Sequence, residues 1–169
     1  MIASSPQAHC VCVADGNPHA LCWGTNGFQE NEIRAHLIPL RDEAVEAIAF
    51  DGCIATAVSE LRCDGVMVLR RRGQTDLLFV ELKNTRNAQH GFYQLIHTAH
   101  QRSDYQAIQS HEERRAPGPL KQQAFLITTK RIAPLERAKA ERQANGLKIT
   151  VIPVQRGSGE VPNLRDHLS

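Results

Sequence analysis

Three charged residues in the middle of the chain, Asp64, Glu81 and Lys83, have the types and the spacing of a hydrolytic metal site. Asp64 stands near the beginning of one apolar run and Glu81 near the end of the next, so a turn at residues 71–74 would bring both carboxylates to one end of a sheet. Glu81 and Lys83 are two residues apart and therefore share one face of an extended strand. The sequence thus predicts that two carboxylates and an ammonium group lie close together.

This combination of groups suits the hydrolysis of a phosphodiester. The carboxylates of Asp64 and Glu81, with the carbonyl of Leu82 between them, are the hard oxygen ligands that Mg²⁺ prefers together with several waters, and Mn²⁺ should substitute. A cation held there would lower the pKa of a bound water and stabilise the charge on a scissile phosphate. Lys83 would orient that water or offset the developing negative charge.

The apolar patterns around these residues predict the elements that must position them. The strands that carry the acids are expected at 63–69 and 76–82, with a turn that contains Gly73 between them. The stretch LRDEAVEAIAF at 40–50 has apolar residues at the i, i+4, i+7, i+8 spacing of a helix, and residues 53–58 form either a strand or another helical turn. Further elements are a long helix from about 88 to 113, a strand at 124–128, a helix at 134–145 and a strand at 147–154. The predicted fold class is therefore α/β, with three layers and a mixed central sheet.

The pattern of Asp64, sixteen intervening residues and then Glu81-Leu82-Lys83 at the end of an apolar strand resembles motifs II and III of the PD-(D/E)xK nuclease superfamily. That superfamily includes restriction enzymes and archaeal Holliday-junction resolvases. The resemblance implies a restriction-endonuclease-like αβββαβ core over about residues 40–130. It also implies a Mg²⁺-dependent nuclease that acts on DNA in restriction, repair, phage defence or as an antibacterial toxin. Cys63 stands where the motif name has Pro, a position that varies within the superfamily.

The resemblance also implies two supporting residues. The superfamily carries an acid on the first helix, which Glu43 and Glu46 match, and a polar residue on the helix after the motif, which Gln94 matches. Glu43 is preferred to Glu46 because it lies at the flank of the apolar face on a helical wheel. Glu43 is then expected to support the metal shell, and Gln94 to help order the site.

Length and composition predict one folded domain. A chain of 169 residues with 41% hydrophobic and 22% charged residues is typical of a soluble globular protein. We expect a single domain at 1–156, with an N-terminal hairpin and loop at 1–32, of which residues 24–32 are the loop, the catalytic core at 40–130 and a loose tail at 157–169. No apolar run reaches the length of a membrane helix, and residues 1–6 lack the features of a secretory signal, so a cytoplasmic protein is expected.

The charges are unevenly distributed along the chain. Residues 1–61 carry two basic and eight acidic side chains, whereas residues 62–131 carry twelve basic and six acidic ones. A basic middle third suits a nucleic acid, although solvated surface charges are the ordinary alternative. Arg70, Arg71 and Arg72 could contact a phosphate backbone or could form a charged turn. Dimerisation is common in the superfamily, so a homodimer is a further expectation.

The five cysteines all lie within the first 63 residues. Their odd number does not indicate a disulfide framework, so reduced thiols are expected. A hairpin that pairs residues 10–13 with 20–23 across a turn at 15–18 is favoured over a zinc site, because the paired C-x₂-C motifs of structural zinc sites are missing. The zinc alternative would use residues from the same segment: His9, Cys10, Cys12, His19 and Cys22.

A non-catalytic protein that keeps the fold is the main functional alternative. Such a protein would bind nucleic acid or neutralise a toxin. The presence of all three central charged residues favours an enzyme, because clustered carboxylates repel one another unless a cation offsets them.

Overall fold

The computed structural model describes residues 5–16, 19–57, 60–84 and 88–169. Two short 3-10 turns, η1 (Ala8–Cys10) and η2 (Leu164–His167), lie near the two ends of the chain. The helices are α1 (His90–Gln101), α2 (Ser103–Arg115) and α3 (Pro134–Gln143). The strands are β1 (Gly27–Glu30), β2 (Ile33–His36), β3 (Ala44–Ala49), β4 (Gly65–Arg71), β5 (Gln74–Lys83), β6 (Leu120–Thr128) and β7 (Lys148–Pro153).

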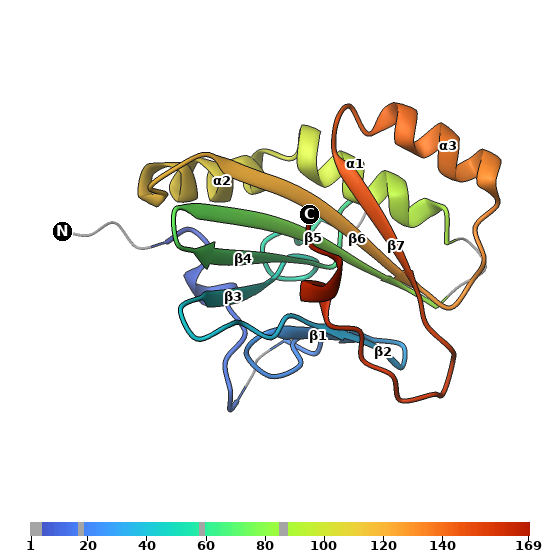
Figure 1. Ribbon diagram of the computed structural model, residues 1–169, viewed down its shortest axis with the longest axis horizontal. Helices are drawn as coiled ribbons and strands as arrows, with labels where there is room; N and C mark the ends of the chain where they lie inside the picture. The colour runs from blue at the N-terminus through green and yellow to red at the C-terminus, as the bar shows by residue number, and fades with distance from the viewer. Residues whose placement is uncertain (1–4, 17–18, 58–59, 85–87) are drawn as a thin grey trace.

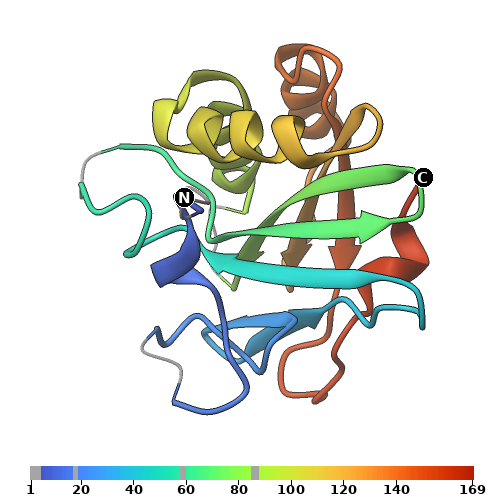
Figure 2. The ribbon, with the colours of Figure 1, turned by 90° about the vertical axis from the view of Figure 1, so that its left-hand side faces the viewer.

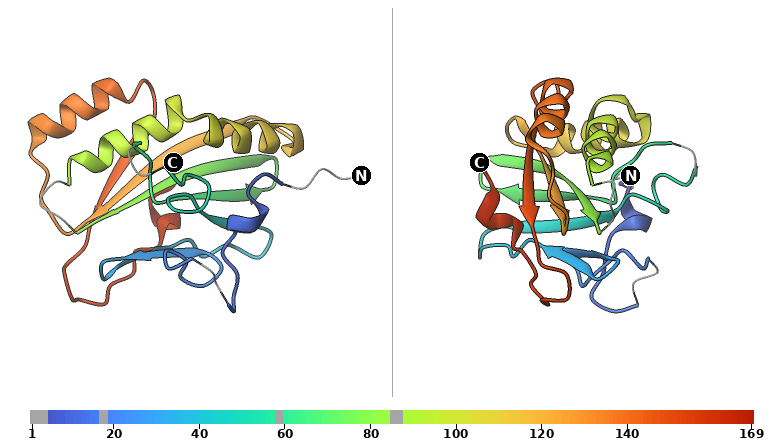
Figure 3. Two further views of the ribbon diagram at one scale, coloured as in Figure 1. Left: turned by 180° about the vertical axis from the view of Figure 1, so that it is seen from behind. Right: turned by 90° about the vertical axis from the view of Figure 1, so that its right-hand side faces the viewer.

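A five-stranded mixed sheet forms the centre of the fold, in the order β3-β4-β5-β6-β7 (Figure 1). Neighbours from β3 to β5 are antiparallel, and neighbours from β5 to β7 are parallel. The three helices cover one face, and the antiparallel hairpin of β1 and β2 lies on the other (Figures 2 and 3). The α/β class and the mixed sheet predicted from the sequence are confirmed.

The central strands are apolar on both faces because each face packs against another layer. In β4, Val66 and Val68 belong to the core beneath the helices, whereas Met67 and Leu69 belong to the core beneath the hairpin. Gly65 marks the closest approach of the hairpin, since a Cβ at this position would lie 2.4 Å from the Phe28 ring. The hairpin is therefore a packed layer that reaches the start of β4, directly after Asp64.

The predicted helix at 40–50 is wrong, because Ala44–Ala49 is the edge strand β3. Its residues also alternate with a period of two: Ile48 belongs to the helix-side core, and Ala47 and Ala49 belong to the hairpin-side core. Pairing of all six residues of β3 with Gly65–Arg70 of β4 overrides the helix propensity of the segment. Residues 53–57 form no strand, and residue 58 lies outside the described residues.

Other boundaries differ in smaller ways. The long helix expected to 113 is two helices, because Arg102 between α1 and α2 has an extended backbone. The expected loop at 24–32 contains β1. The N-terminal segments do not pair with each other as a hairpin: Val11 bridges Ile48 of β3, and Cys22 bridges Phe28 of β1. The middle of the expected turn, residues 17–18, lies outside the described residues.

Four of the five cysteines form disulfides, so the expectation of reduced thiols is wrong. The pairs are Cys10–Cys53 and Cys12–Cys22, and Cys63 is a buried free thiol. The partner of Cys10 is more than forty residues away in sequence, which explains why spacing within the N-terminal segment did not indicate the pairing. Among the described residues, no helix has the length and apolar character needed to cross a membrane.

The expected loose tail at 157–169 is also wrong from Asn163 onward. The Asn163 side chain accepts hydrogen bonds from the backbone N–H groups of Ile38 (3.1 Å) and Arg165 (3.2 Å). Leu164 is fully buried in the hairpin-side core. The Gly, Ser and Pro content of the preceding residues marks a connection to this docked segment and not a free end.

Replacing Leu164 with alanine should therefore lower the free energy of unfolding by about 2–5 kcal/mol, the usual effect of truncating a buried leucine. Asp166→Ala, in the same turn but exposed, should change it by no more than about 0.5 kcal/mol. Urea unfolding of the two variants measures the difference. Equal, small effects would mean that the tail does not pack against the core in solution.

Candidate active site

Two hydrogen bonds link Asp64 to Glu81 and its neighbour Leu82 across the β4–β5 hairpin. The backbone N–H of Asp64 donates to Oε2 of Glu81 at 2.9 Å, and the N–H of Leu82 donates to Oδ2 of Asp64 at 2.7 Å. The register that pairs Gly65 with Val80 places the two acids at the same end of the sheet. Each carboxylate is thus fixed by the backbone of the opposite strand, and both are buried, with Asp64 4% and Glu81 0% exposed.

Lys83 joins this pair. Its Nζ lies 2.9 Å from Oε1 of Glu81, and its side chain is 18% exposed. The two side chains meet because they project from the same face of β5. The structure therefore brings together the three residues that the sequence singled out, with the ammonium group nearer to solvent than the carboxylates.

A fourth charged residue, Glu30, reaches the site from the last position of β1. It interacts electrostatically with Asp64, Glu81 and Lys83. The sequence reasoning missed this acid because residues 24–32 were interpreted as a loop. The only local signal is the short apolar-polar run that ends at Glu30, and this run does not indicate which strand the hairpin faces.

The crowding of acids raises their pKa values. Burial raises the pKa of Asp64 well above its usual range, and the charges of Glu81 and Glu30 raise it further. Burial also raises the pKa of Glu81, to about 8, although Lys83 partly opposes this. The pKa of Glu30 is raised, again mainly by burial. For Lys83 burial lowers the pKa, but the neighbouring carboxylates, Glu81 first, outweigh this and raise it overall. Without another cation these acids favour their protonated forms, and a cation bound beside them would favour the ionised forms.

A cavity of about 740 Å³ opens beside Asp64. Its lining includes Glu30 and Arg34 of the hairpin, Asp51 and Gly52 of the turn after β3, and residues 19–21 of the segment beside β1. The cavity gives a ligand access to Asp64 while most of the carboxylate cluster stays buried.

Gln94 of α1 lies behind the site and contacts the chain just before Asp64. Its Nε2 donates to the carbonyl oxygen of Arg62 at 3.0 Å, and the Nε of Arg62 lies 2.6 Å from Oδ1 of Asp51. Helix α1 also passes close to the charged residues, since a Cβ at Gly91 would lie 3.3 Å from Cγ of both Glu81 and Lys83. Gln94 is thus placed to position the segment that leads into Asp64.

Glu43 and Glu46 do not reach the site. Glu43 accepts a hydrogen bond from the N–H of Leu40 at 2.9 Å and forms an ion pair with Arg165. Glu46 lies 3.3 Å from Arg70. The predicted role of Glu43 is therefore wrong: it depended on a helix at 40–50, and the strand that forms instead directs both acids to other partners.

The arginines of the β4–β5 turn lie at the opposite end of the hairpin from Asp64. Arg70 pairs with Glu112 at 2.8 Å, and Arg71 forms an ion pair with the buried Asp76. These two guanidinium groups neutralise acids of the fold, which supports the charged-turn interpretation over a phosphate contact.

The alternative zinc site cannot form in this structure, because its three cysteines, Cys10, Cys12 and Cys22, are all in disulfide bonds. Among the described residues, one group of three potential metal ligands lies with its atoms within 4.8 Å, and it comprises His9, Cys10 and Cys53. The sulfur atoms of Cys10 and Cys53 are bonded to each other in a disulfide, so this group holds no metal in the oxidised protein. The ligand atoms of Asp64, Glu81 and Glu30 do not all lie within this distance of one another. A cation held directly by one or two of these acids would therefore reach the others through bound water.

Comparison of the chain with protein-family models, with curated proteins and with solved structures finds no match.

Proposed function

We propose that this protein is a divalent-metal-dependent nuclease that hydrolyses phosphodiester bonds, with DNA as its substrate. The observation that carries the proposal is the reciprocal arrangement of Asp64 and Glu81, each held by the other strand's backbone, with Lys83 at 2.9 Å from Glu81. A structural ion pair would need one acid for one base. Here three buried or half-buried acids surround a single lysine beside an open cavity.

The donor set fits Mg²⁺ or Mn²⁺. Asp64, Glu81 and Glu30 supply hard oxygen atoms, and the carbonyl of Leu82 lies between the residues that form the centre. Burial is the main cause of the raised pKa values of the three acids, so a bound cation would stabilise their ionised forms. Such a cation, when bound, supplies an activated water and offsets charge on a phosphate.

Three further side chains have separate roles in the proposed reaction. Lys83 is placed to hold the attacking water and to offset negative charge as it develops on the phosphate. Glu30 closes the cluster from the cavity side, and Gln94 positions the chain before Asp64 through the Arg62 carbonyl. The backbone hydrogen bonds to Asp64 and Glu81 keep both carboxylates fixed, so little reorganisation is needed when a ligand binds.

The order of elements supports the same proposal. The sequence β3, β4, β5, α1, α2, β6 has the βββαβ order of a restriction-endonuclease-like core with one additional helix. Asp64 directly precedes the second of these strands, and Glu81 lies on the third. The first helix of that core has no counterpart at 40–50, and its acid is replaced in our proposal by Glu30 from the hairpin. The core that we propose therefore draws one ligand from outside the central sheet.

Purified protein should convert supercoiled plasmid to nicked or linear DNA in Mg²⁺ or Mn²⁺ and not in EDTA. Asp64→Asn, prepared in the same way, controls for contaminating nucleases and should be inactive. Absence of metal-dependent cleavage of plasmid, single-stranded DNA and RNA by the wild type would overturn the proposal and favour a non-catalytic protein with this fold.

A further inference from the structure

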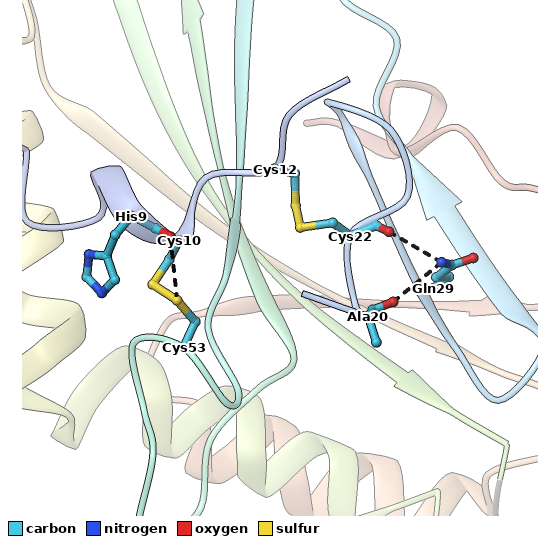
Figure 4. The surroundings of a disulfide bond; sticks show 7 residues. All are labelled: His9, Cys10, Cys12, Ala20, Cys22, Gln29 and Cys53. Carbon is cyan, nitrogen blue, oxygen red and sulfur yellow. Dashed lines mark hydrogen bonds between the residues drawn. A yellow bond between two sulfur atoms is a disulfide. The ribbon is translucent and has the colours of Figure 1, made fainter. Parts of the chain in front are cut away.

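The Cys12–Cys22 disulfide anchors the segment that supports Glu30. Residues 20–23 run beside β1: the N–H of Gln29 donates to the Leu21 carbonyl at 2.7 Å, and the N–H of Trp23 donates to the Gly27 carbonyl at 3.0 Å. The Gln29 side chain adds hydrogen bonds from Nε2 to the carbonyls of Ala20 (3.4 Å) and Cys22 (3.3 Å), as Figure 4 shows. Glu30 follows Gln29 directly, so this edge segment sets the position of the strand that ends in Glu30.

The other end of the disulfide is fixed to the central sheet. The N–H of Cys12 donates to the Ala47 carbonyl of β3 at 2.8 Å, and Val11 forms a bridge with Ile48. The Cys12–Cys22 bond therefore links the sheet that holds Asp64 and Glu81 to the layer that holds Glu30. The same edge segment contributes Ala20 and Leu21 to the wall of the cavity.

The second disulfide has a different place and provides a comparison. Cys10–Cys53 joins the same N-terminal segment to the turn after β3, apart from Cys12–Cys22 (Figure 4). The backbone N–H of Asp51 in that turn already donates to the Asp64 carbonyl at 3.0 Å. This disulfide thus secures a turn that a backbone hydrogen bond to Asp64 also holds.

We propose that the Cys12–Cys22 disulfide is a positioning element for Glu30, so that the metal site is complete only in the oxidised protein. This inference rests on the proposed function and extends it to the conditions under which the site forms. Reduction by a dithiol such as dithiothreitol transfers two electrons: the S–S bond breaks, each sulfur becomes a thiol, and the reagent closes to its cyclic disulfide. The edge segment then keeps its hydrogen bonds to β1 but loses its covalent link to β3, so it no longer fixes β1 relative to the central sheet.

The inference also concerns the environment in which the protein acts. Disulfides persist in oxidising compartments and are rare in the reducing cytoplasm. A site that depends on Cys12–Cys22 would be active outside the cytoplasm and inactive within it.

Mn²⁺ binding, followed by electron paramagnetic resonance without any substrate, tests the inference separately from catalysis. Cys12→Ser/Cys22→Ser should bind Mn²⁺ roughly 10–100-fold more weakly than the oxidised wild type, the usual effect of removing support from a metal ligand. Dithiothreitol should weaken binding by the wild type to the same level. Cys10→Ser/Cys53→Ser, the matched control, should stay within about twofold of the wild type.

A double-mutant cycle shows whether the disulfide acts through Glu30. Glu30→Gln alone should weaken Mn²⁺ binding, and adding Cys12→Ser/Cys22→Ser should weaken it no further. Additive effects, or wild-type affinity in the double-serine variant, would overturn the inference while leaving the proposed function intact. If the oxidised wild type binds no Mn²⁺, the proposed function fails and the inference fails with it.

Gln29→Ala keeps the inference testable if the double-serine variant does not fold. This substitution removes the side-chain hydrogen bonds to Ala20 and Cys22 but leaves both disulfides in place. It should weaken Mn²⁺ binding several-fold through the same displacement of Glu30. Wild-type affinity in folded Gln29→Ala would contradict the role of the edge segment.

Discussion

Replacing Lys83 with methionine is expected to lower the rate of DNA cleavage by about 10²–10³-fold, the usual effect of removing one preorganised charge-stabilising group. Methionine retains an apolar stem of similar length but cannot hold a water or offset charge on the phosphate. Because Lys83 is not a metal ligand in our proposal, Mn²⁺ binding should remain. The loss should appear in kcat much more than in KM, which single-turnover and steady-state assays together can separate.

Lys148→Met is the matched control for this experiment. Lys148 is exposed at the start of β7 and pairs in register with Gln123, toward the end of the sheet away from Lys83. Its replacement should leave the cleavage rate within about twofold, apart from a small change in salt dependence if it contacts DNA. Equal losses of cleavage rate in the two variants, or full activity in Lys83→Met, would show that Lys83 takes no part in the reaction.

The stability of the metal-free protein is expected to fall as the pH rises from about 4.5 to about 8. The Glu81 pKa is raised from 4.5 to about 8 in the folded protein. In this interval the folded state keeps a proton that the unfolded chain has lost, so raising the pH favours unfolding. The effect should be on the order of a few kcal/mol, since one pKa unit corresponds to about 1.4 kcal/mol, and the raised pKa of Asp64 acts in the same direction.

Urea unfolding in EDTA at pH 5, 7 and 9 measures this dependence. Glu81→Gln, which cannot ionise, should be the less pH-sensitive protein and should exceed the wild type in stability at pH 9. Mg²⁺ should stabilise the wild type more at pH 8 than at pH 5, because the cation binds the deprotonated carboxylates. A wild-type stability that stays flat over this range, with no extra effect of Mg²⁺ at high pH, would show that Glu81 ionises freely in the fold.

The arrangement of Asp64, Glu81 and Lys83 could be predicted from the sequence because it depends on local geometry. A strand places residues two apart on one face, and a tight turn with Gly73 folds one apolar strand onto the next. The structure has that hairpin, with the acids opposite one another. The later elements, from β6 to β7, were also predicted with small boundary errors, since their apolar patterns are strong and well separated.

Residues 40–50 show where local patterns are insufficient. Alanine, glutamate and leucine favour a helix, and the same residues also fit a period of two. Only the presence of β4 as a partner, paired along its length with β3, decides between them. The error carried over to Glu43, because an acid was sought on a helix that does not form.

The sequence alone determined the charged core of the site, since that core lies within one hairpin whose register follows from the side-chain alternation. The tertiary structure decided the rest: Glu30 arrives from a separate layer, the disulfide Cys12–Cys22 links that layer to the sheet, and the tail docks through Leu164. These features depend on contacts between segments distant in sequence. Such contacts form only when the packing of complete layers outweighs the conformational entropy lost in closing the chain between them.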